Sequence, residues 1–100
     1  MTEKELGKVV VTAGVDREMK NSAKFHVFVA NCLFRRYLQE DWGEMCIEDK
    51  AMNDSAVKNG DDRIFASYNI PEELSDVGDK IWIITEWDRS VTTILFPEEY

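Results

Sequence analysis

The stretch KIWIITEWDRSVTTILFPEEY, residues 80–100, decides the fold. Two apolar runs rich in β-branched residues flank the polar segment EWDRS, which predicts strands over 80–86 and 91–96. Asp88-Arg89 lacks the glycine that a two-residue type I′ turn prefers. We therefore expect a hairpin with a four-residue loop at 87–90, built around a type I turn, in which Asp88 and Arg89 form at most a weak, exposed ion pair.

This loop length pairs Glu86 with Val91 and gives the hairpin two faces. The more apolar face is expected to pack on a helix, and its pairs are Thr85–Thr92, Ile83–Ile94 and Ile81–Phe96. The other face carries an apolar patch, consisting of Trp82, Ile84 and Leu95. Such a patch on a small protein needs a cover, either the short helix predicted below or a second copy in a twofold dimer.

Outward from the hairpin, the sequence alternates between patterns of strand and helix. RIFASYNI predicts a strand over 63–70, PEELSDVGD a loop over 71–79, and GKVVVTAG a strand over 7–14, followed by a polar connection. Helices are predicted over 22–39 and 47–58. Asn-Gly at 59–60 supplies a left-handed cap to the second helix.

The helix over 22–39 carries an apolar stripe at helical spacing and can be capped by Asn21 or Ser22. The stripe contains Phe25, Phe28, Val29, Cys32, Leu33 and Tyr37, and it is widened by Val27, Ala30, Phe34 and Leu38. This helix is therefore expected to be largely buried. The shorter helix is expected to turn Met52, Ser55 and Ala56 inward.

The predicted order is β-α-α-β-β-β, which favours one α+β domain over residues 1–100. An antiparallel meander sheet is expected to pack against one long buried helix. The run Val9-Val10-Val11 should place the first strand in the same sheet, because these side chains need burial.

Composition indicates a globular cytoplasmic protein. Apolar residues make up 44% of the chain, and no run approaches the ~18 apolar residues of a membrane span. The start MTEKELGK lacks the apolar segment of a signal peptide. Cys32 and Cys46 are expected to be reduced thiols that are not bonded to each other.

The net charge of −8 is unevenly distributed. Residues 1–38 carry a net charge of +3, whereas residues 39–100 carry −11. The second segment contains a candidate acidic protein-binding face, consisting of Glu40, Asp41, Glu44, Glu48, Asp49, Asp54, Asp61 and Asp62. Negative charge opposes direct binding to nucleic acid and to anionic membranes, and suits either a basic protein partner or solubility alone.

No motif for catalysis or for a cofactor is found. The single histidine, His26, lies beside the helical stripe, and neither cysteine has a catalytic context. The acids near residues 49–62 do not follow the spacing of a calcium loop, and the glycines form no phosphate-binding motif. We therefore expect no enzyme activity, metal or cofactor.

Three blocks of the chain carry a family resemblance. GKVVVTAGV, DWGEMCIEDKAMNDSAVKNGDDRIFASY and KIWIITEWDRSVTTILFPEEY resemble a family of small acidic proteins described only as "plasmid-related", which occur on plasmids and integrative elements of Gram-positive bacteria. Residues 15–24 and 71–79 lie outside the resemblance. It implies a mobile-element gene product in a bacterial cytoplasm, and it implies no activity and no site residues.

These observations favour a non-catalytic protein-binding module. One alternative is a DNA mimic that inhibits a host defence or restriction protein, with the acidic face imitating phosphates. Another is a small homodimeric structural subunit that uses the patch of Trp82, Ile84 and Leu95.

Overall fold

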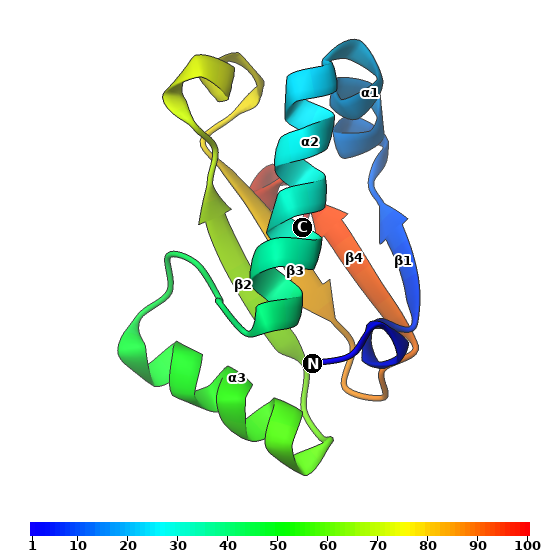
Figure 1. Ribbon diagram of the computed structural model, residues 1–100, viewed down its shortest axis with the longest axis vertical. Coiled ribbons are helices and arrows are strands. Elements are labelled where there is room, and N and C mark those ends of the chain that lie inside the picture. Colours follow the sequence, from blue (N-terminus) through cyan, green and yellow to red (C-terminus); the bar gives the residue numbers. More distant parts are fainter.

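The computed structural model describes residues 1–100 and contains one four-stranded sheet (Figure 1). Strands β3 (Lys80–Thr85) and β4 (Val91–Leu95) form the expected hairpin. Its register is confirmed, with Trp82 opposite Leu95 and Thr85 opposite Thr92. Residues 86–90 connect the strands, the Glu86 amide donates to the Val91 carbonyl at 3.0 Å, and Arg89 takes a left-handed conformation with φ of 61°.

The remaining strands make the sheet mixed, which corrects the expectation of a simple antiparallel meander. Strand β2 (Ile64–Asn69) is antiparallel to β3, as a meander requires. Strand β1 (Lys8–Val11), however, is parallel to β4, so the order across the sheet is β1-β4-β3-β2. The valine run does join the sheet, but as an edge strand next to the last strand of the chain.

The helical residues also differ from the prediction, because the single long helix is absent. Helix α1 (Ala13–Asn21) occupies the expected polar connection, since Thr12 caps it by accepting from the Val15 amide. Helix α2 (Ala23–Asn31) starts anew at Ser22, which accepts from the Phe25 amide at 3.2 Å. A π-helical turn then spans Cys32–Arg36, and a 3-10 turn spans Tyr37–Gln39.

The π-helical turn allows the apolar residues on both sides of it to be buried while Arg36 stays out of the core. With about 100° of rotation per residue, a regular helix that buries Phe25 and Val29 would also turn Arg36 into the core. A π turn adds one residue to the helix and shifts the phase after it. As a result, Tyr37 is buried, whereas the Arg36 guanidinium reaches Asp41 at 2.8 Å and stacks on the Tyr68 ring.

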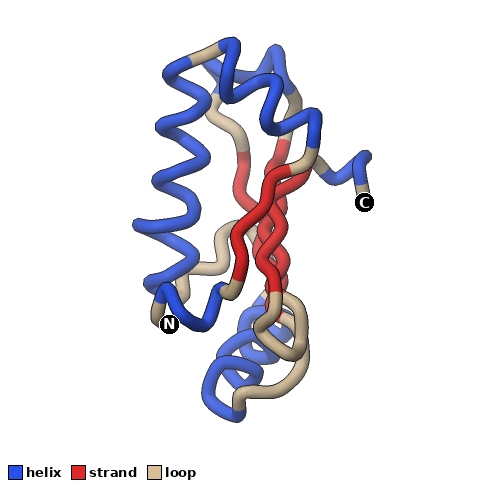
Figure 2. The backbone as a smooth tube through the Cα atoms, turned by 90° about the vertical axis from the view of Figure 1, so that its right-hand side faces the viewer, coloured by secondary structure: helices blue, strands red, loops and turns tan.

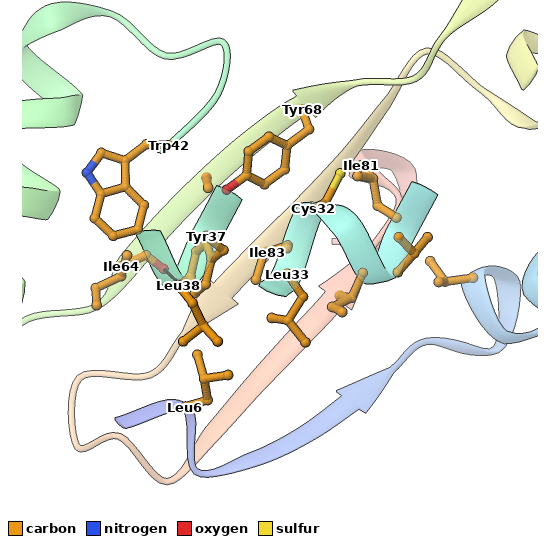
Figure 3. Packing of buried hydrophobic residues seen from close by; sticks show 14 of the residues in the cluster. Leu6, Cys32, Leu33, Tyr37, Leu38, Trp42, Ile64, Tyr68, Ile81 and Ile83 are labelled. Atoms are coloured by element: carbon orange, nitrogen blue, oxygen red, sulfur yellow. Dashed lines mark hydrogen bonds between the residues drawn. The ribbon is translucent and has the colours of Figure 1, made fainter. Parts of the chain in front are cut away.

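The core lies between the sheet and the α2 segment, which crosses one face of the sheet (Figures 1 and 3). Most of the expected stripe is buried, as are Ile81 and Ile83 on the facing strand. Val27 and Phe34, in contrast, are 58% and 48% exposed, which corrects their assignment to the core. They lie on the side of the helical segment that faces away from the sheet, and Phe28 is only partly buried.

The opposite face of the sheet is covered by the C-terminal residues rather than by the short helix (Figure 2). The Tyr100 ring packs edge-on against Trp82 with 5.9 Å between ring centroids. The Glu99 carboxylate holds this segment in place by accepting from the Thr12 hydroxyl at 2.6 Å and the Gly14 amide at 3.1 Å. Consequently Ile84 and Leu95 are buried within the chain.

We predict that Leu33→Ala lowers the free energy of unfolding by about 2–5 kcal/mol, because it leaves a cavity in the core. Phe34→Ala is the matched control, since it removes a larger but half-exposed side chain and should cost less than about 1 kcal/mol. Urea denaturation of both variants measures the difference. Equal costs would show that the buried side of this segment is wrongly assigned.

The two free cysteines should differ in reactivity. Burial raises the pKa of the Cys32 thiol to about 12, whereas Cys46 is exposed. A thiol reagent added to the folded protein is therefore expected to label Cys46 alone, and Cys32 only after unfolding. Rapid labelling of both thiols in the native protein would contradict the burial of Cys32.

Candidate functional site

The free edge of β2 is closed by the segment that contains most of the predicted acidic face. Ser67 donates its amide to the Trp42 carbonyl at 3.3 Å and accepts from the Glu44 amide at 2.7 Å. The Glu44 carboxylate accepts from the Asn69 amide at 2.9 Å. An edge strand with unpaired amides invites aggregation, so this arrangement protects one side of the sheet.

Gly43 allows the backbone of segment 42–44 to lie close to the backbone of β2. It forms a parallel bridge with Ser67 and has φ of 76°, a conformation that favours glycine. A Cβ atom at this position would collide with the Ser67 carbonyl oxygen. The Asp41 carbonyl beside it accepts from the Tyr68 hydroxyl at 2.7 Å, which anchors the same segment to the core side of β2.

Helix α3 (Ile47–Asn59) continues the closure of this edge and lies at the end of the sheet, away from α1 and α2 (Figure 1). The Asn53 side chain donates to the Phe65 carbonyl at 2.7 Å and accepts from the Phe65 amide at 3.2 Å. It thus takes the place of a neighbouring strand. The buried side of α3 consists of Asn53 and Ala56, which corrects the expectation that Met52 and Ser55 turn inward.

Arg89 fastens the C-terminal end of α3 to the hairpin loop. Its guanidinium donates to the carbonyls of Ala56 at 2.8 Å, Asp61 at 3.1 Å and Asp62 at 2.6 Å. It also donates to two carbonyls of its own loop, at Glu86 and Trp87. A cation at this position complements the helix dipole, and no ion pair with Asp88 is formed.

An open groove of about 340 Å³ lies where α3 meets β2. Met52, 61% exposed, lines both this groove and an adjoining hollow along α3. Asp62 lines both hollows as well. The residues around the groove are Met45, Asp49, Met52, Asn53, Asp62, Arg63 and Phe65.

The structure divides the predicted acidic face into two groups. Four of its carboxylates have structural partners: Glu40 binds the N-terminal ammonium, Asp41 binds Arg36, Glu44 binds the Asn69 amide, and Asp54 accepts from the Trp42 indole. Hydrogen bonding from Arg36 holds the pKa of Asp41 below its usual range. The other four, Glu48, Asp49, Asp61 and Asp62, are also exposed and lie on or beside α3, where Asp62 accepts only from the adjacent Arg63 amide.

The predicted dimer patch is largely enclosed within one chain. Ile84 and Leu95 are buried, and Trp82 is half-buried between the rings of Phe65 and Tyr100. Arg63 donates to the Tyr100 hydroxyl at 2.9 Å and lies over the same ring. The sequence alone shows Trp82, Ile84 and Leu95 on one face but does not show that the chain folds back over them.

No cluster of three or more His, Cys, Asp or Glu side chains has a geometry that would hold a metal ion. No helix combines the length and the hydropathy required to cross a membrane. A scan against protein-family models and searches of curated proteins and of solved structures found no match to this chain.

Sequence reasoning did not identify Met45, Arg63 or Phe65 as parts of one groove. The groove forms only when α3 docks on the edge of β2, a contact without a local sequence pattern. A signal was available for the role of Arg89, because a basic residue in a hairpin loop can reach the carbonyls at the end of a nearby helix.

We predict that Arg89→Ala lowers the free energy of unfolding by about 2–3 kcal/mol, because several carbonyls lose a charged donor. Asp88→Ala is the matched control in the same loop and should cost less than about 1 kcal/mol, since Asp88 is exposed and accepts only from the nearby Ser90 amide. Thermal denaturation followed by circular dichroism compares them. Equal melting temperatures would contradict the fastening role of Arg89.

Proposed function

We propose that this chain is a non-catalytic protein-binding module that recognises a basic segment carrying an apolar anchor. The observation that carries the proposal is the exposed thioether of Met52 between two adjoining hollows, with acidic side chains around both. A partner side chain entering the groove would meet apolar surface. Lys or Arg residues flanking that anchor would meet Asp49, Asp61 and Asp62.

The apolar part of the groove suits an anchor of variable shape. Met45 and Met52 are unbranched and polarisable, and methionine-rich surfaces adapt to different partners. Phe65 adds a partly buried aromatic wall held by its backbone bonds to Asn53. A pocket with one rigid wall and two flexible ones favours Leu, Met or Phe in the ligand.

Charge supports a basic partner over an acidic one. The segment 39–100 has a net charge of −11, and the acids beside the groove are exposed. Such charges steer association and are screened by salt within about 8–10 Å at physiological ionic strength. Their exposure also suits recognition better than general acid–base catalysis, which relies on a pocket that shifts the pKa of its acids.

The DNA-mimic alternative requires the acids to act as an extended array of charges. Because Glu40 and Asp41 are paired with cations, the uncompensated charge is concentrated on and beside α3, which favours a compact peptide ligand. The setting that we propose is the bacterial cytoplasm, as the product of a mobile element. Its partner there is a protein with a basic surface rather than nucleic acid or a membrane.

We predict that a peptide library displayed on phage and selected on the immobilised protein yields sequences with Lys or Arg next to Leu, Met or Phe. Met52→Ser should weaken binding of a selected peptide about tenfold or more, which corresponds to about 1.4 kcal/mol. Asp49→Asn combined with Asp62→Asn should weaken it further and reduce its dependence on salt. Asn keeps the oxygen that accepts from the Arg63 amide at position 62.

Two variants outside the groove serve as matched controls. Val27→Ser changes an exposed apolar residue on α2, and Asp76→Asn removes an exposed acid from the 3-10 helix Glu72–Val77, which takes the place of the loop expected before β3. Neither should alter peptide binding. Binding that is unaffected by Met52→Ser, or equally weakened by Val27→Ser, would contradict the assignment of the groove. Protection of DNA from nucleases by the protein would favour the DNA-mimic alternative instead.

A further inference from the structure

The two edges of the sheet differ in whether their outward backbone groups have hydrogen-bond partners. On β2, backbone groups of Phe65, Ser67 and Asn69 have partners from Asn53 and the segment 42–44. On β1, Lys8 and Thr12 donate their amides to the carbonyls of Ser90 and Ile94 on the β4 side. The alternation of a strand then directs the amides and carbonyls of Val9 and Val11 away from the sheet.

The outer side of β1 is uncovered. Figure 1 shows no element beside β1 on the side away from β4, and Figure 2, which looks onto that side, shows the strand in front. Val9 is 42% exposed, and Val10 and Val11 are only partly buried. An edge of this kind, with unpaired backbone groups and apolar side chains, is a template for another strand.

We propose that β1 pairs with β1 of a second copy of this chain, antiparallel across a twofold axis at Val10. In this register Val9 of one copy lies opposite Val11 of the other, and each such pair exchanges two backbone hydrogen bonds. The outward groups of Val9 and Val11 are therefore all used. The sheets of the two copies join into one with eight strands.

The strand is complementary to itself in this register, which is why a second copy is the occupant. Lys8 lies opposite Thr12, so no like charges face each other across the axis. The partly exposed valines pack against one another, as β-branched side chains do across paired strands. The pairing uses a surface different from the α3 groove and from the patch of Trp82, Ile84 and Leu95.

A cysteine at the axis tests the register. Val10 and its symmetry mate form a pair without mutual hydrogen bonds, for which the Cα atoms lie about 4.5 Å apart, within the range of a disulfide. Val10→Cys in a Cys46→Ser background should form a cross-linked dimer under mild oxidation. Lys8→Cys in the same background is the control, because its two copies would be about 14 Å apart.

Lys8 is exposed, whereas Val10 is partly buried. Random collisions would therefore cross-link Lys8→Cys at least as well as Val10→Cys, which would overturn the proposal. The expected result is at least a tenfold greater yield from Val10→Cys. Absence of cross-linking from Val10→Cys would overturn it as well.

Sedimentation without any cysteine replacement provides a second measurement. The wild-type protein should show a dimer whose fraction rises with concentration, and Val9→Pro should remain monomeric. Proline is tolerated here because the Val9 amide has no bond within the sheet. Val9→Thr keeps that amide and should still dimerise. A wild-type protein that is monomeric at every concentration, or a dimer that persists in Val9→Pro, would overturn the proposal.

Discussion

A chain of buried hydroxyl groups connects the parts of the core. The Tyr37 hydroxyl lies 2.7 Å from the Thr85 hydroxyl, which lies 2.7 Å from that of Thr92, and Thr92 donates to the Leu6 carbonyl at 2.7 Å. Because a carbonyl only accepts, the direction of the whole chain is determined from this end. Thr92 accepts from Thr85, and Thr85 accepts from Tyr37. Every hydroxyl is then satisfied, and a buried hydroxyl without a partner would be costly.

This chain constrains three separate features of the fold. It requires Thr85 and Thr92 to lie opposite each other, so a hairpin slipped by one residue would bury an unpaired group. It requires Tyr37 to point at the sheet, which the π-helical turn achieves by shifting the helical phase after Asn31. It also holds Leu6 under the hairpin, just before Gly7, where a Cβ would meet the Ser90 carbonyl oxygen at 2.5 Å.

The parts that the sequence predicted well are those determined by local patterns. The hairpin register follows from two-residue alternation and loop length, and Gly60 caps α3 in the left-handed conformation as expected. The parallel pairing of β1 could not be read locally, because it joins residues more than eighty positions apart. The burial of Asn53 was not predicted, because polar residues of a helix are normally solvated. The Asn53 side chain instead binds the backbone of β2 as a neighbouring strand would. The cover over Trp82 depends on Glu99 reaching Thr12, another contact between distant residues.

Helix α3 differs from the other helices in how it is attached. Its fully buried residues are Asn53 and Ala56, and hydrogen bonds from Asn53 and Arg89 add to the packing of Ala56 and Val57 against the core. Two other apolar side chains of the helix, Ile47 and Met52, face solvent at 83% and 61% exposure. The charged segment EWDRS is therefore part of the architecture, because Arg89 fixes the carbonyls that end this helix. Arg89 also holds the main chain at Asp61 and Asp62 through its bonds to their carbonyls, and this positions the acidic side of the groove. The loop thus helps to shape the proposed binding surface.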